Sequence, residues 1–242
     1  MYAMGYSAKE MLDIFKEYCG SIKYFELSNL LKLLICRLFN NKVRVDGLNS
    51  GRIIEKKVRQ VAEKKGIYNI SDIKVPLFIP SVDLNTGNLI VFTSENKRKD
   101  FSDNIIYLNN IDIAKAVRSS CSYPGIFSPV RIRNYVLADG GIRENVPWKI
   151  LKESNCNTVF SIIFKENPSS KECNNILDVL TTSFDLICHE LSNYELNGAD
   201  YLIDIQTPHV SLLDCSKIEE LYILGYRQTK EFIYKNRLVL KN

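Results

Sequence analysis

The residue best suited to chemistry is Asp139, which is followed at once by Gly140 and Gly141. The mostly apolar residues 135–138 precede it, so the carboxylate is predicted to stand at the end of a short strand. A carboxylate held rigidly in that position can accept a proton from a hydroxyl group. The two glycines allow positive φ, let the backbone turn sharply and leave room for a neighbouring loop. Taken alone, however, Asp-Gly is a frequent turn dipeptide, and a plain hairpin turn is then the better interpretation.

Two longer segments around Asp139 favour the catalytic interpretation. Residues 116–130 read Ala-Val-Arg-Ser-Ser-Cys-Ser-Tyr-Pro-Gly-Ile-Phe-Ser-Pro-Val, and residues 137–147 read Leu-Ala-Asp-Gly-Gly-Ile-Arg-Glu-Asn-Val-Pro. Their order, with a short strand pair between them, closely resembles the patatin-like phospholipase family. Residues 82–87, Val-Asp-Leu-Asn-Thr-Gly, resemble that family's Thr-Asp-Leu-x-Thr-Gly hairpin. The resemblance covers essentially the whole chain, and the ordered set of motifs is specific although no single motif is.

The resemblance implies a lipid acyl hydrolase that cleaves ester bonds of phospholipids or other acyl esters with a Ser–Asp dyad. In the family the Asp of this motif is the proton acceptor, which places that role on Asp139, with Gly140 and Gly141 as its supporting motif. The implied partner is an acyl-lipid or ester substrate in lipid metabolism, and no cofactor or metal ion is expected. The implied fold class is α/β, with a patatin-like parallel-rich sheet and helices on both faces. The mixture of predicted strands and helices along the chain agrees with that class.

The chain departs from the family's pattern at the nucleophile. The family carries its serine in Gly-x-Ser-x-Gly, on an elbow between a strand and a helix, and the 242 residues contain no such motif. Residues 1–10, Met-Tyr-Ala-Met-Gly-Tyr-Ser-Ala-Lys-Glu, resemble the segment that follows this elbow. The resemblance therefore implies that the serine lies about three helical turns before Met1 and that the glycine-rich oxyanion loop lies further upstream. We expect an N-terminally truncated chain that lacks the first strands of the family fold and is inactive as it stands. The alternative is a non-catalytic remnant, or a pseudoenzyme that binds acyl chains or a protein partner.

Other candidate nucleophiles are better explained by structural roles. Ser7 begins a Ser-x-x-Glu pattern with Glu10 and is predicted to cap a helix. Three further serines belong to the small-residue segment before Pro124 and are predicted to pack closely against the site: Ser119, Ser120 and Ser122. A triad with a histidine is conceivable, but the patatin-like family uses none, so His189 and His209 are predicted to be surface or satisfied residues.

The predicted elements are helices mixed with short strands. Helices are expected from Ser7, over 27–39, 51–65, 112–119, 147–153 and 174–196, and from Ser216 to Tyr234. Hairpins are expected over 74–93 and 129–138, toward the edge of the sheet. Strands are expected over 157–164, buried on both faces, and over 201–205. Residues 1–152 are predicted to be the remainder of the patatin-like catalytic domain, and residues 153–242 the C-terminal strands and helices of the same domain.

Composition limits the partners and the compartment. The formal net charge of +4 is too small, and the Lys and Arg residues are too scattered, to favour nucleic acid. Seven cysteines without metal-site or redox spacing are predicted to be reduced, mostly buried thiols, which favours a cytoplasmic location. No signal peptide is expected, and no apolar run reaches the length of about 18–20 residues that a membrane span needs. The apolar segment 30–39 is more often core than membrane-binding, although it leaves peripheral membrane contact open.

Overall fold

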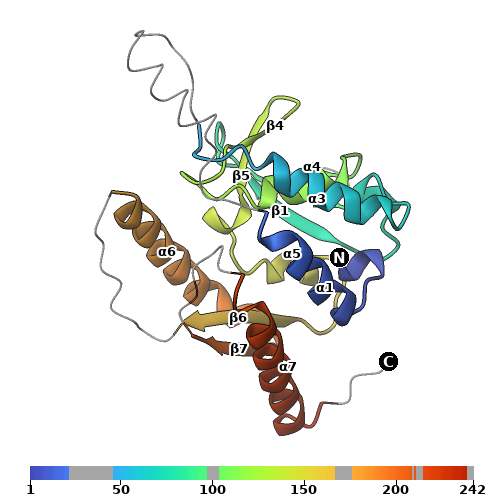
Figure 1. The fold of residues 1–242 in the computed structure, drawn as a ribbon, viewed down its shortest axis with the longest axis vertical. Helices are drawn as coiled ribbons and strands as arrows, with labels where there is room; N and C mark the ends of the chain where they lie inside the picture. The colour runs from blue at the N-terminus through green and yellow to red at the C-terminus, as the bar shows by residue number, and fades with distance from the viewer. Residues whose placement is uncertain (22–45, 97–103, 167–175, 209, 211–214, 239–242) are drawn as a thin grey trace. The chain divides into compact units, whose positions relative to one another are not determined.

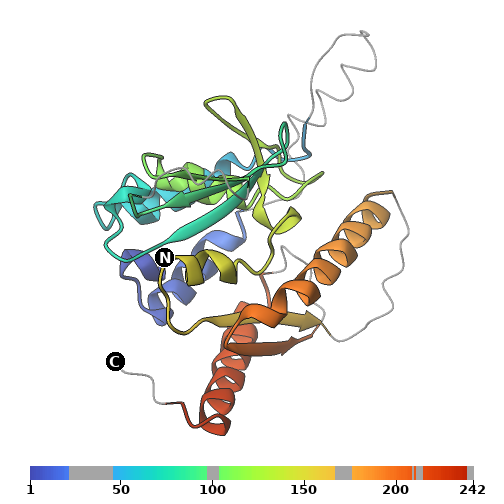
Figure 2. The same ribbon diagram turned by 180° about the vertical axis from the view of Figure 1, so that it is seen from behind.

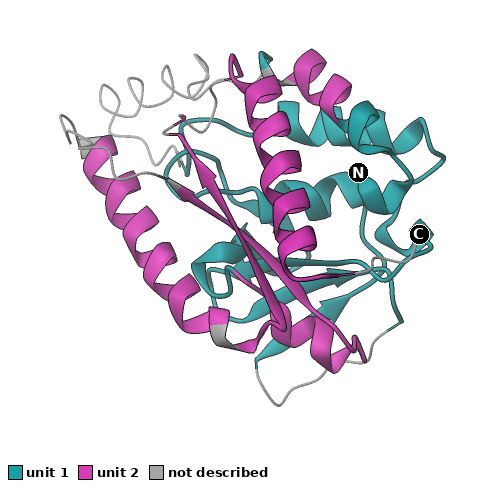
Figure 3. Cartoon of the chain, turned by 90° about the horizontal axis from the view of Figure 1, so that it is seen from below, with its two compact units in different colours: residues 1–11, 20–145 teal, residues 12–19, 146–242 magenta. Residues whose placement is uncertain are grey.

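The computed structural model describes residues 1–21, 46–96, 104–166, 176–208, 210 and 215–238 (Figures 1 and 2). The chain divides into two compact units, which we describe separately (Figure 3). Unit 1 comprises residues 1–11 and 20–145, and unit 2 comprises residues 12–19 and 146–242. The α/β class is confirmed, whereas the predicted single domain, with parts 1–152 and 153–242, stays a prediction. The helix predicted over 27–39, the apolar segment 30–39 within it and His209 all lie outside the described residues.

Unit 1 is built on a five-stranded sheet with the strand order β3-β2-β1-β5-β4. Its strands are β1 (Phe78–Asp83), β2 (Leu89–Thr93), β3 (Ile105–Leu108), β4 (Val130–Ile132) and β5 (Tyr135–Asp139). The β2–β3 ladder is parallel, and the β1–β2, β1–β5 and β4–β5 ladders are antiparallel. Antiparallel pairing therefore predominates in this sheet, in contrast to the parallel-rich sheet that was expected, because hairpins connect two of its strand pairs.

The two predicted hairpins are both present, but they occupy different places in the sheet. The β4–β5 hairpin ends at the edge strand β4, as expected. The β1–β2 hairpin lies at the centre, because β1 pairs with β2 on one side and with β5 on the other. Asp83 at the end of β1 helps to hold this place, since its carboxylate accepts a hydrogen bond from the backbone N–H of Val136 in β5 at 2.9 Å. The expected edge position of residues 74–93 is therefore wrong, because the place of β1 depends on its pairing with β5, which is distant in the sequence.

Two helices of unit 1 form a layer beside the sheet. Helix α4 (Ile113–Ser120) packs on β1 and β5, and helix α3 (Arg52–Glu63) packs on α4 (Figure 1). The strand β2 is buried along its length, which agrees with its continuous apolar sequence. Near the N-terminus, the short 3-10 helix η1 (Tyr2–Met4) precedes α1 (Ala8–Cys19). The predicted capping box of α1 is confirmed: Ser7 N–H donates to Glu10 Oε2 at 2.7 Å, and Glu10 N–H donates to Ser7 Oγ at 3.3 Å.

In its described part, unit 2 contains a parallel pair of strands, three α-helices and one 3-10 helix, besides residues 12–19 of α1. In chain order its elements are α5 (Trp148–Glu153), β6 (Phe160–Glu166), α6 (Ile176–Glu195), η4 (Leu196–Gly198), β7 (Tyr201–Thr207) and α7 (Ile218–Lys235). Strand β6 pairs with β7, and α7 packs on β7. The side chains of Ile162 and Phe164 in β6 are 54% and 71% exposed. The prediction that this strand is buried on both faces is therefore wrong, because these two alternate residues share a face that the described part of the chain leaves uncovered.

The described cysteines differ from the expected buried, reduced thiols. Cys121, Cys156 and Cys188 carry free thiols, but Cys121 is exposed and the other two are half-buried. Cys215 is disulfide-bonded. The burial prediction fails because these cysteines occupy a helix end, a loop and a partly exposed helix face instead of the core. Within the described ranges, no helix combines the length and apolar character that crossing a bilayer requires.

Candidate active site

Asp139 stands where strand β5 ends and the short 3-10 helix η3 (Gly140–Ile142) begins. It is the N-cap residue of η3, and its Oδ1 accepts a hydrogen bond from the Gly141 N–H at 2.9 Å. Its own backbone N–H donates to the carbonyl oxygen of Ser122 at 3.1 Å. The side chain is half-buried. The Asp-Gly-Gly segment is therefore a strand-to-helix junction that fixes a carboxylate, and not the plain hairpin turn that the dipeptide alone would indicate.

Close approach explains the two glycines after Asp139. Neither Gly140 nor Gly141 has positive φ, so the conformational freedom that glycine allows is not used here. A Cβ on Gly140 would lie 2.6 Å from the carbonyl oxygen of Pro80 in β1. A Cβ on Gly141 would lie 2.9 Å from Asn145 Oδ1 and 3.2 Å from Asp139 Oδ1. The expected room for neighbouring groups is confirmed: Gly140 lets η3 pack on β1, and Gly141 leaves space beside the carboxylate.

Burial governs the electrostatics of the Asp139 carboxyl. Desolvation raises the pKa of Asp139 above its ordinary value, and the hydrogen bond from the Gly141 N–H opposes that shift by favouring the ionised form. A carboxylate with a raised pKa is a stronger base once it is ionised, which suits the acceptance of a proton from a hydroxyl group. The site therefore combines a fixed position with an increased proton affinity.

The thiol of Cys121 lies close enough to Asp139 to be affected by its charge. Desolvation first, and then the negative charge of Asp139, raise the pKa of Cys121, while the positive charge of Arg118 lowers it. Cys121 is exposed as a residue, yet its sulfur is crowded enough by neighbouring atoms for desolvation to dominate. Because the thiolate is the reactive form, a raised pKa makes this thiol a poor substitute for a serine nucleophile.

A buried guanidinium lies in the helix that leads to the site. Arg118 in α4 is 2% exposed, and its Nη1 donates to Ser122 Oγ at 2.6 Å. Its Nη2 donates to the carbonyl oxygens of Ser50 at 2.8 Å and Ser128 at 2.7 Å. Gly51 lies against this group, since a Cβ there would stand 2.0 Å from Arg118 Nε. Arg118 thus connects the segments that contain Ser50, Ser122 and Ser128. The carbonyl oxygen of Ser122 in turn accepts the backbone N–H of the candidate base.

Two of the three serines of the small-residue segment, Ser119 and Ser122, are buried and hydrogen-bonded, and Ser120 is half-buried. Ser119 is 0% exposed, and its Oγ donates to the carbonyl oxygen of Lys115 at 2.8 Å. Ser122 is 1% exposed, and its Oγ donates to the carbonyl oxygen of Arg118 at 2.9 Å. The predicted packing role is confirmed for both, because neither hydroxyl is presented to a substrate. His189 is exposed on α6, as expected for a surface residue.

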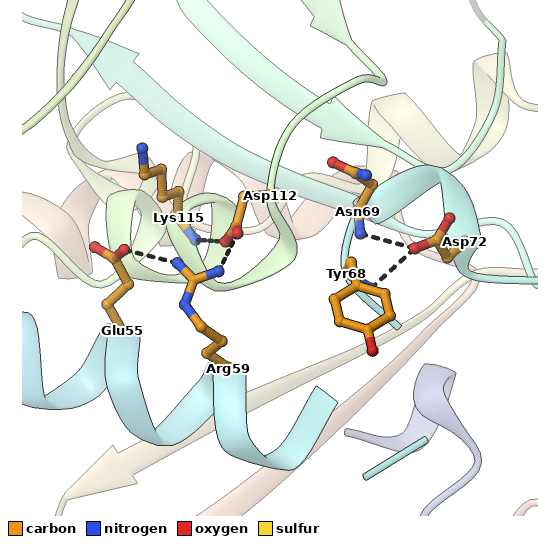
Figure 4. Close-up of polar contacts among 7 residues, drawn as sticks. All are labelled: Glu55, Arg59, Tyr68, Asn69, Asp72, Asp112 and Lys115. Carbon is orange, nitrogen blue, oxygen red and sulfur yellow. Dashed lines mark hydrogen bonds and ion pairs between the residues drawn. The ribbon is translucent and has the colours of Figure 1, made fainter. Parts of the chain in front are cut away.

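A network of charges fixes the first turn of α4 (Figure 4). Asp112 is the N-cap residue, and its Oδ1 accepts a hydrogen bond from the Lys115 N–H at 3.0 Å. Its Oδ2 pairs with the guanidinium of Arg59 in α3. The same guanidinium pairs with Glu55, one turn earlier in α3, at 2.9 Å. The hydrogen bond to Asp112 is the main cause of a raised pKa of Arg59, so this cation remains charged and clamps α3 to α4.

The second group in Figure 4 is a turn that adjoins the same end of α4. Asp72 Oδ2 accepts hydrogen bonds from the backbone N–H groups of Tyr68 at 2.9 Å and Asn69 at 2.8 Å. These bonds, the one from Asn69 first, lower the pKa of Asp72. The turn joins α4 directly, because the N–H of Ile113 donates to the carbonyl oxygen of Tyr68 at 3.0 Å. Helix α4 is thus held at its start by this turn and by α3, and at its end by Arg118.

Two residues of this region were not singled out from the sequence. Arg118 could have been identified from the sequence, because it is a cation on the side of the predicted helix that faces the core. Ser81, which lies opposite Asp139 in the β1–β5 ladder and is 0% exposed, had none. Serine is too common in strands for its type alone to mark a site. Among the described residues, no group of His, Cys, Asp or Glu side chains could hold a metal ion.

Comparison with known proteins finds similarity both to a family model and to a curated protein. A sequence model of the patatin-like phospholipases matches residues 1–152, which is more than half of the chain and includes Asp139. The chain is also similar to the uncharacterized protein YqhO of Bacillus subtilis (strain 168), with 26% identity over 247 residues. That alignment covers 96% of this chain and 82% of the relative.

Proposed function

The chain belongs to the patatin-like phospholipase family, and on this premise we propose that it is the base-bearing part of a Ser–Asp lipid acyl hydrolase. Family membership supports the general function, which is hydrolysis in lipid metabolism. The observation that supports the finer proposal is the half-buried carboxylate of Asp139, held at a strand end by the Gly141 N–H at 2.9 Å. We infer that Asp139 is the proton acceptor and that Gly140 and Gly141 create the space it needs.

The nucleophile of this proposal is a serine in a Gly-x-Ser-x-Gly segment, which the 242 residues do not contain. We infer that such a segment, joined to the N-terminal side of this chain, supplies it, because residues 1–10 resemble the sequence that follows the family's elbow. The glycine-rich loop that donates hydrogen bonds to the oxyanion would come from the same part. Each donor of that kind is worth about 10²–10³-fold in rate.

The proposed reaction balances with these groups and water alone. The ionised Asp139 accepts the proton of the serine hydroxyl while the serine oxygen attacks the ester carbonyl carbon. The tetrahedral oxyanion then collapses, the alcohol leaves with the proton from Asp139, and the acyl group remains on the serine. Water attacks this acyl-enzyme with Asp139 again as the base, which releases the carboxylic acid and the free serine.

We also propose an acyl-lipid or simpler ester as the substrate and a cytoplasmic location with, at most, peripheral membrane contact. The net charge of +4 supports weak attraction to an anionic membrane surface. The free thiols of Cys121, Cys156 and Cys188 favour a reducing compartment, whereas the disulfide at Cys215 argues against it. Fractionation of cells that produce the tagged protein would test the location, and recovery only after detergent extraction would contradict it.

Hydrolysis of p-nitrophenyl acyl esters tests the proposed function. The 242-residue chain is expected to show no turnover above background, and the chain preceded by a Gly-x-Ser-x-Gly segment and an oxyanion loop is expected to show turnover. In the extended protein Asp139→Asn should abolish hydrolysis, while the control Asp46→Asn, at an exposed ion pair with Arg131, should leave it unchanged.

Two outcomes would contradict the proposal. An extended protein that folds but hydrolyses no ester would support the alternative, a non-catalytic remnant or a pseudoenzyme that binds acyl chains or a partner. Turnover by the 242-residue chain that is lost on Asp139→Asn would show that another nucleophile operates.

A further inference from the structure

Ser81 is a buried hydroxyl that the proposed mechanism does not use. It lies in β1, the middle strand of the sheet, and is 0% exposed. Among the described residues, its Oγ is the buried side-chain oxygen that has no hydrogen-bond partner. Buried polar groups in folded proteins are nearly always hydrogen-bonded, and an exception calls for a physical reason such as a catalytic role.

The register of the sheet places Ser81 directly opposite Asp139. Residues that face one another across an antiparallel pair point to the same side of the sheet, with Cβ atoms about 4.5–5.5 Å apart. A serine hydroxyl can take three staggered positions about χ1. At such a Cβ separation, a change of rotamer can carry Oγ to within hydrogen-bonding distance of the facing carboxylate.

The neighbouring contacts keep this juxtaposition in place. Asp83, two residues after Ser81, accepts the Val136 N–H of β5 at 2.9 Å, which prevents the β1–β5 register from slipping. Directly after β5, Gly140 in η3 packs against Pro80, where a Cβ would lie 2.6 Å from the carbonyl oxygen. The hydroxyl and the carboxylate are therefore held opposite each other by contacts on both sides.

The Asp139 carboxylate has the capacity for a second donor. A carboxylate can accept about four hydrogen bonds, and the Gly141 N–H provides one to Oδ1. A donor from β1 would approach the carboxylate from a different element than the Gly141 N–H, which lies in η3. Two donors on two elements would fix the rotation of the carboxylate, which a single bond at one oxygen does not.

We propose that Ser81 is a positioning residue whose hydroxyl turns to donate a hydrogen bond to the ionised carboxylate of Asp139. The inference rests on the proposed function, because it takes Asp139 as the base. The bond favours the ionised form before proton transfer and holds the accepting oxygen in place. It also gives the unpartnered hydroxyl a use that offsets the cost of its burial.

The other charged or titratable groups near Asp139 come from three elements. Helix α4 contributes Arg118 and, at its C-cap, Cys121; β1 contributes Asp83; and Arg143 and Glu144 follow η3. The variants below leave all five unchanged. A shift in the titration of Asp139 is therefore attributable to the hydroxyl that is removed.

Carboxyl NMR of the 242-residue chain, labelled with ¹³C at aspartate, tests the proposal without any need for catalysis. Asp139→Asn assigns the signal. Ser81→Ala is expected to raise the pKa of Asp139 by about 1 unit, since a hydrogen bond to the ionised form lowers a carboxyl pKa. The matched control is Ser119→Ala, which also removes a hydroxyl that is 0% exposed but bonded to Lys115. It should leave the titration of Asp139 unchanged, and Ser81→Thr should keep the native pKa.

An unchanged pKa in Ser81→Ala, or an equal shift in Ser119→Ala, would overturn the proposal. In the extended enzyme, Ser81→Ala should move the acid limb of the kcat/KM profile upward by the same amount as the NMR titration. If the extended protein shows no hydrolysis that depends on Asp139, the proposed function fails, whereas the NMR titration still decides whether Ser81 and Asp139 are hydrogen-bonded.

Discussion

Replacing Gly140 by alanine tests whether close packing of η3 on the central strand holds the candidate base. The new Cβ would lie 2.6 Å from the carbonyl oxygen of Pro80 and 2.8 Å from its carbonyl carbon. These are backbone atoms of β1, so no side-chain rotation can relieve the overlap, and η3 must move away. Overpacking costs about 1–3 kcal/mol. We expect the upper end of that range, because a backbone segment has to shift.

Urea unfolding followed by circular dichroism measures this loss. With an m value of about 2 kcal/mol/M, a loss of about 3 kcal/mol lowers the midpoint by about 1.5 M. Gly225→Ala in α7 is the matched control, since a Cβ there meets no atom within 4 Å. The same chemical change should stabilise the helix by about 0.5–1 kcal/mol. A Gly140→Ala midpoint equal to or above that of the native chain would refute the close-packing argument.

Three further predictions use the same unfolding assay. Arg118→Met leaves two part-buried carbonyl groups without their donor and should cost about 2–4 kcal/mol; an unchanged midpoint would show that the guanidinium does not stabilise the fold. Asp112→Ala removes an N-cap and an ion pair and should cost about 1–2 kcal/mol, whereas Asp46→Ala, at an exposed pair, should cost less than about 0.5 kcal/mol; equal losses would contradict the capping argument. For Asp139 the sign follows from its raised pKa: the carboxyl favours the folded state below its unfolded pKa, and that contribution is lost as the pH rises through the folded pKa. Asp139→Asn keeps an acceptor for the Gly141 N–H. Its stability relative to that of the native chain should therefore be greater near neutral pH than at a pH about 1 unit below the ordinary Asp pKa. A stability difference between the two chains that does not change with pH would contradict this prediction.

Elements that depend on neighbouring residues were predictable from the sequence. The Ser7 cap, the end of α3 before Gly66 and the start of α4 at Asp112 each follow from residues within one helical turn. The place of β1 at the centre of the sheet was not predictable, because it depends on pairing with β5, more than fifty residues later in the chain. Periodicity indicates that a strand exists but not which strands become its neighbours.

The candidate site shows the same division between local and distant causes. Asp139 was identified from an ordered motif, but the reason for its glycines was only partly predicted. Residue type allows a special φ, whereas the structure requires absent Cβ atoms where η3 approaches β1. Ser81 was missed because its significance arises only from the register that places it opposite Asp139. Information of that kind belongs to the tertiary structure.

The supports of Asp139 all belong to unit 1, which bears on the choice between an enzyme and a remnant. Arg59 and Asp112 fix the start of α4, Arg118 fixes its end, and the Ser122 carbonyl oxygen then accepts the Asp139 N–H at 3.1 Å. A carboxylate held in this way would need little reorganisation on accepting a proton from a hydroxyl group, which is the arrangement that catalysis favours. A sequence free of functional demands would tolerate changes at costly features such as a buried guanidinium and an unpartnered hydroxyl. That both are present in the same unit as the carboxylate supports a hydrolase over a decayed remnant.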